Sequence, residues 1–132
     1  NTVDMSWQEY VDKNMLATNA AQKAIIIGKD GTILASGPPG FSIQRAEIDI
    51  IWACFDSPAR FLAEGVNIQA TKYMALKANE DIVIAKKGAA GAVLARTETT
   101  FIAAITNLDS TDIRSSADII ENVAGHLMDA GV

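Results

Sequence analysis

The stretch from Val66 to Thr106 constrains the fold of this chain most, because its apolar residues show no helical period. It contains four segments rich in strand-forming residues, "TKYMALK", "DIVIAKK", "GAVLAR" and "TTFIAAIT". Short connections at 78–80, 88–91 and 97–98 separate these segments. Consecutive strands that are joined so closely must run antiparallel. The stretch is therefore predicted to form an antiparallel meander.

A second strand-rich region lies nearer the N-terminus. "KAIIIGKDGTILAS" places two β-rich runs on either side of Asp30-Gly31, which is typical of a β-hairpin. "GPPG" at 37–40 follows and predicts a rigid turn that ends the hairpin.

Helical spacing appears before, between and after these strands. Residues 43–55 are predicted to form a helix, and Pro58 to begin a short helical turn through Glu64. One face of the 43–55 helix carries Ile48, Ile51, Trp52 and Phe55, so Trp52 is expected in the core. A last helix, capped by Ser110 or Asp112, carries an apolar stripe of Ile113, Ala117, Ile120, Ala124 and Leu127.

The first helix is expected over about residues 6–17 and carries two large aromatic residues at its start. In "SWQEYV", Ser6 and Glu9 form a capping box, and Met5 is placed to pack against Tyr10. Trp7 and Tyr10 fall on one face. The residues alone leave open whether these rings are core or a recognition surface. Helices at both ends and a central antiparallel sheet predict an α+β fold.

Length and charge exclude several classes of protein. The 132 residues fit one domain over 5–132, with residues 1–4 expected to be an expression remnant outside it. The net charge of -5 argues against a general nucleic-acid binder. Cationic side chains gather in the middle of the chain, at Lys72, Lys77, Lys86, Lys87 and Arg96, whereas its last part is acidic. The lone Cys54 and the absence of a long apolar run predict a soluble, cytoplasmic protein.

Catalytic and metal-binding patterns are weak in this chain. His126 is the only histidine, Cys54 has no basic neighbour in its helix, and no metal-ligand spacing occurs. "KKGAAG" connects two strands and lacks the spacing of a phosphate-binding loop. We therefore predict that the protein is not an enzyme and uses no cofactor or metal.

These segments together resemble the profilin family, small proteins that bind monomeric actin. The resemblance runs from Met5 to Val132 and rests on "SWQEYVD", "IIGKDGTILA", "ATKYM", "KKGAAG" and "ENVAGHLMDAGV" in this order. It implies a central antiparallel sheet with the N- and C-terminal helices packed side by side on one face. It also implies a cytoplasmic, cytoskeletal protein that regulates actin polymerisation. A second groove would bind polyproline segments of actin nucleators and elongation factors.

The resemblance assigns residues to both sites. Trp7 and Tyr10 match the aromatic residues of the polyproline groove; Leu34 stands where an aromatic is common, and His126 where tyrosine or histidine is frequent. The implied actin face contains Leu62, Ala63, Lys72, Lys77, Lys86, Ala117, Asp118, Glu121 and Asn122. Phosphoinositide binding is also reported for the family, and this acidic chain is a weak candidate for it.

Two alternatives come from other classes. A roadblock-type or longin-type scaffold also places helices around an antiparallel sheet but dimerises through an edge strand. It would explain the meander but not Trp7 and Tyr10 together at the helix start. A small hydrolase that uses His126 with an acidic residue would need a nucleophile that the sequence does not nominate.

Overall fold

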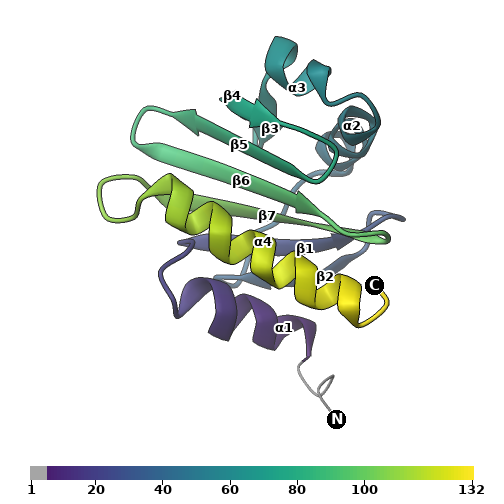
Figure 1. The fold of residues 1–132 in the computed structure, drawn as a ribbon, viewed down its shortest axis with the longest axis vertical. Coiled ribbons are helices and arrows are strands. Elements are labelled where there is room, and N and C mark those ends of the chain that lie inside the picture. Colours follow the sequence, from purple (N-terminus) through teal and green to yellow (C-terminus); the bar gives the residue numbers. More distant parts are fainter. Residues whose placement is uncertain (1–5) are drawn as a thin grey trace.

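The computed structural model describes residues 6–132, so the expected remnant at 1–4 and the predicted packing of Met5 lie outside the described residues. Within 6–132, seven strands form one antiparallel sheet in the order β2-β1-β7-β6-β5-β4-β3 (Figure 1). The strands are β1 (Lys23–Gly28), β2 (Ile33–Gly37), β3 (Val66–Ile68), β4 (Thr71–Ala78), β5 (Ile82–Lys87), β6 (Ala90–Arg96) and β7 (Thr100–Asn107). The predicted hairpin and meander are confirmed, and pairing of β1 with β7 joins them.

The helices are α1 (Trp7–Glu9), η2 (Tyr10–Leu16), α2 (Arg45–Asp56), α3 (Ala59–Glu64) and α4 (Ile113–Asp129). The prediction of one α-helix over 6–17 is wrong in one respect, because η2 is a π-helix. Its buried side chains, Tyr10, Val11 and Met15, include two that lie five residues apart. The hydrogen bonds of a π-helix span five residues, so its turn is wider than the 3.6 residues of an α-helix and brings Tyr10 and Met15 closer to the same side.

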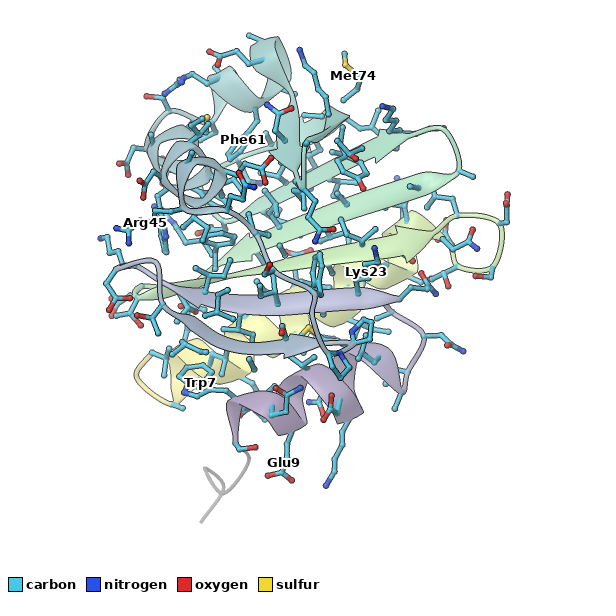
Figure 2. The ribbon with its side chains drawn as sticks, turned by 180° about the vertical axis from the view of Figure 1, so that it is seen from behind. Trp7, Glu9, Lys23, Arg45, Phe61 and Met74 are labelled. Carbon is cyan, nitrogen blue, oxygen red and sulfur yellow. The ribbon has the colours of Figure 1, made fainter. Side chains whose placement is uncertain are left out.

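The sheet is covered on both faces. The first helix and α4 pack on one face, and α2 and α3 cover the other (Figure 1). Strand alternation divides the core accordingly: Ile25 and Ile27 pack toward α2 and α3, whereas Ile26 packs toward the terminal helices. Figure 2 shows Phe61 of α3 on the side away from Trp7. The predicted placement of both terminal helices on one face is confirmed.

Capping and packing refine the predicted helix ends. Asp112, and not Ser110, caps α4, because its carboxylate accepts a hydrogen bond from the Ser115 amide at 3.3 Å. The 43–55 helix begins only at Arg45. Trp52 is partly buried, edge-on to Phe101 at 5.4 Å between ring centroids, so it packs at the margin of the core that was predicted to enclose it.

The outer edge of β2 is occupied by a side chain. Gln8 Nε2 donates a hydrogen bond of 2.8 Å to the carbonyl of Ser36, and the exposed Pro38 and Pro39 follow the strand directly. At the other end of the sheet, β3 is only three residues long. No helix within 6–132 is both long enough and apolar enough to span a lipid bilayer.

Candidate functional site

The start of the first helix is fixed by a capping box. The Glu9 amide donates to Ser6 Oγ at 3.1 Å, and the Ser6 amide donates to Glu9 Oε1 at 3.0 Å. The hydrogen bond from the Ser6 backbone, with a further contribution from Lys13, lowers the pKa of the Glu9 carboxyl. Because this helix end is held, Trp7 and Tyr10 have defined positions one turn apart.

Trp7 and Tyr10 lie in one apolar cluster with Leu34 of β2 and Leu127 of α4. Tyr10 is 6% exposed, whereas Trp7 is only partly buried. Figure 2 shows Trp7 at the junction between the first helix and α4. We call Trp7, Tyr10, Leu34 and Leu127 the aromatic site. The structure therefore brings together three of the four residues that the resemblance assigned to a polyproline groove.

Val132 belongs beside the aromatic site but was not predicted there. α4 ends in a Schellman motif, in which the Gly131 amide bonds the Met128 carbonyl and the Val132 amide bonds the Leu127 carbonyl at 3.0 Å. Gly131 has a φ of 89°, which turns the chain back so that Val132 packs against the cluster. The glycine just beyond the helical stripe was the signal for this return.

His126 lies on a different surface of α4. It is exposed and lines a hollow of about 210 Å³ together with Lys13, Asn14 and Asn122. The hollow lies between the first helix and α4 and does not include Trp7, Tyr10 or Leu34. The structure thus places His126 next to Leu127 in the chain but outside the aromatic site.

A second candidate site is built on β4 and β5. Lys72 and Met74 are exposed and flank the buried Tyr73. Met74 pairs directly with Lys86, and Lys77 pairs with Ile84 of the same strand. Directly paired residues point to the same side of a sheet, and Lys72 alternates with the oppositely directed Tyr73 as Met74 does. The four side chains of Lys72, Met74, Lys77 and Lys86 therefore lie on the face that α4 partly covers. We call Lys72, Met74, Lys77 and Lys86 the lysine face.

A hollow of about 470 Å³ separates the lysine face from α4. It mixes apolar and charged side chains, and it is lined by Leu76, Lys77, Ile84, Ile113, Arg114, Ala117, Asp118 and Glu121. Asp118 and Glu121 are exposed, whereas Ala117 is 2% exposed and contributes mainly to the floor. The cationic middle and acidic end of the chain therefore meet here.

The remaining residues assigned to the actin face divide between two surfaces. Leu62 is 51% exposed on α3, the helix that packs against β4, and Ala63 beside it is also exposed. Asn122 lines the hollow with His126, so the structure does not bring it to the lysine face. Met74 and Leu76, 59% and 57% exposed, were missed as candidates, although alternation in "TKYMALK" places Met74 with Lys72.

The groups that could support catalysis are dispersed. Burial raises the pKa of the Cys54 thiol, which keeps it protonated and unreactive, and burial also raises the pKa of the Tyr73 phenol. In the part of the chain that the structure describes, no three His, Cys, Asp or Glu side chains come together as metal ligands.

Comparisons with known proteins agree with this arrangement. The family model for profilin matches residues 5–132. Profilin-1 of Dictyostelium discoideum is 38% identical over 127 residues, which cover 96% of this chain and 99% of that protein. The crystal structure of Acanthamoeba castellanii profilin II, 29% identical, has a TM-score of 0.87 and covers 96% of this chain and 100% of that one.

A further solved structure shares the fold. Mouse profilin IIa, in complex with a double repeat from the FH1 domain of mDia1, is 20% identical and has a TM-score of 0.77 over 97% of this chain and 100% of that one. The resemblance drawn from the sequence is confirmed along residues 5–132. The chain therefore belongs to the profilin family.

Proposed function

We propose that this protein binds monomeric actin through the lysine face and proline-rich segments through the aromatic site, and thereby regulates actin polymerisation. Profilins are actin-binding proteins without enzymatic activity. The observation that carries the proposal is the presence of two separate exposed surfaces of suitable chemistry on one profilin fold.

The aromatic site has the chemistry that a proline-rich ligand needs. A polyproline II helix is stiff before it binds, so docking it on aromatic rings costs little conformational entropy. The partly exposed Trp7 supplies such a ring, and Leu34 and Val132 extend the apolar surface around it. The FH1 complex of mouse profilin IIa, a protein with this fold, supports the same ligand class here.

The lysine face has the chemistry that an acidic partner surface needs. Its three lysines lie around the exposed Met74 and Leu76, which offer apolar area for the centre of an interface. Lysines at the rim of an interface steer association and make it dependent on salt. The decisive experiment is titration of the protein into monomeric actin, and the proposal expects delayed spontaneous polymerisation.

Reversing one charge on the lysine face should slow association with monomeric actin. Lys86→Glu is expected to lower the association rate about tenfold at low salt and to flatten its salt dependence, because an attraction becomes a repulsion. Stopped-flow mixing at two ionic strengths measures both quantities. Lys87→Glu is the matched control: it makes the same charge change at the next, also exposed, position, which points to the other side of the strand. Equal rates for both variants would place Lys86 outside the interface.

Enlarging the aromatic site should strengthen its binding to prolines. Leu34 is partly buried and packs against the same apolar cluster as Trp7, so Leu34→Trp adds a ring to the surface that the peptide would contact. We expect affinity for a proline decamer to rise several-fold, about 1 kcal/mol, because a ring stacks on proline where leucine cannot. Isothermal titration measures the change. Unaltered affinity in a folded variant would mean that Leu34 does not contact the peptide.

A further inference from the structure

The turn between β3 and β4 has an unfavourable sequence for its shape. Ile68 pairs with Thr71, so Gln69 and Ala70 alone form the turn, and their φ angles are 52° and 63°. Two-residue hairpin turns of this kind favour Asn-Gly, because residues with a side chain rarely adopt positive φ. Something other than the turn's own residues must hold it.

Glu47 supplies that support from the first turn of α2. Its Oε1 accepts a hydrogen bond from the Gln69 amide and its Oε2 accepts one from the Ala70 amide, both at 2.8 Å. Gln69 Nε2 also donates to the Ser42 carbonyl at 2.9 Å. Hydrogen bonds to an ionised carboxylate are stronger than neutral ones, and both oxygens are used at once. The carboxylate therefore holds the two residues whose backbone needs holding.

The clamped turn determines where β4 begins. β3 pairs with β4 over only three residue pairs, and a ribbon so short is not stable by itself. Lys72 lies directly after the turn, opposite Asn67, and the stem of its side chain runs close to Gly65 at the end of α3. Loss of the clamp would loosen the end of β4 that carries Lys72.

We propose that Glu47 is a positioning residue for the partner-binding surface: its carboxylate holds the β3–β4 turn and so fixes Lys72 on the lysine face. The inference rests on the proposed binding of actin through that face. Glu47 itself lies on α2, apart from the hollow between β4, β5 and α4.

The isosteric substitution Glu47→Gln tests the clamp. Glutamine keeps the shape but has one acceptor oxygen, and its amide NH2 would face a backbone N–H. We expect affinity for monomeric actin to fall about five- to tenfold. Asp49→Asn is the control on the same helix, since Asp49 forms an exposed ion pair with Arg45, and it should change affinity less than about twofold. Unchanged affinity in Glu47→Gln would overturn the proposal.

A compensating change in the turn separates positioning from other roles. Ala70→Gly removes one unfavourable φ and keeps the Gln69 side chain. Added to Glu47→Gln, it should recover at least about half of the lost binding free energy. Absence of any recovery would mean that Glu47 acts by another route, and would also overturn the proposal.

Amide hydrogen exchange of the protein alone tests, independently of actin, whether Glu47 holds the β3–β4 turn. In Glu47→Gln, amides of residues 69–73 should exchange faster while those of β6 keep their rates, and Ala70→Gly should slow them again. If the wild type failed to bind actin, the proposed function would fail, and faster exchange would still support the clamp. Exchange rates equal to those of the wild type would contradict it.

Discussion

Replacing Trp7 with alanine is expected to abolish measurable binding of proline-rich peptides while leaving the affinity for monomeric actin within about twofold. Trp7 is the largest partly exposed side chain of the aromatic site, and truncating an aromatic anchor typically costs 2 kcal/mol or more, about thirtyfold in affinity. The lysine face is formed by other elements, β4 and β5. Titration with a proline decamer and with actin measures the two effects separately.

The second tryptophan provides the control for this experiment. Trp52 lies on α2, on the opposite face of the sheet, so Trp52→Phe should bind proline peptides as the wild type does. This variant also leaves Trp7 as the single tryptophan, and its fluorescence then reports peptide binding directly. Because Trp7→Ala removes a partly buried ring, its melting curve must be recorded. Loss of both activities in a folded variant would show that the sites are not independent.

Gly65→Ala is expected to destabilise the protein by about 3 kcal/mol, the largest stability change among the substitutions considered. Gly65 ends α3 with φ 77° and ψ -170°, a combination that residues with a side chain essentially do not adopt. A Cβ at this position would also lie 2.6 Å from the carbonyl oxygen of Tyr73. This oxygen belongs to the paired strand β4, so it cannot move without disturbing the strand pairing. Urea unfolding measures the change.

Gly125→Ala is the matched control for this prediction. Gly125 lies inside α4, and a Cβ there would meet nothing within 4 Å. Alanine is favoured over glycine in a helix interior by about 1 kcal/mol, so this variant should be more stable than the wild type. Similar stability of the two variants would contradict the prediction that alanine at position 65 strains the backbone.

The parts of the fold that could be predicted are those set by local pattern. The meander followed from the lack of a helical period, the strand-forming residues and the short connections, all of which are properties of neighbouring residues. β3 was missed because "VNI" is too short to show a period. The π-helix was missed because Tyr10, Val11 and Met15 are buried against other elements of the fold, and the sequence does not show that packing.

The candidate sites could likewise be predicted only where they depend on neighbouring residues. Trp7 and Tyr10 were assigned by the family resemblance, and the capping box that fixes their positions could be predicted because it lies within four residues. Asn122 and Asp118 stand one turn apart on α4, yet they line different hollows. Their separation depends on which flank of α4 faces β4. The resemblance assigned His126 to the groove, because the sequence does not show on which flank of α4 this side chain lies. Glu47 and Gln69 are 22 positions apart, so no spacing rule could pair them.

The two ends of the sheet determine how copies of this protein meet in a concentrated solution. An uncovered edge strand is a template for a neighbouring molecule, and chains that join in this way form aggregates. At β2 the Ser36 carbonyl already accepts the Gln8 side chain, and the two prolines that follow have no N–H to donate. At the opposite edge, β3 covers β4 over only three residue pairs, and residues 74–78 of β4 pair with β5 alone. The β2 edge is therefore protected against pairing with a second copy, and any strand-to-strand contact between copies is expected at the β4 edge instead, next to Met74 of the lysine face.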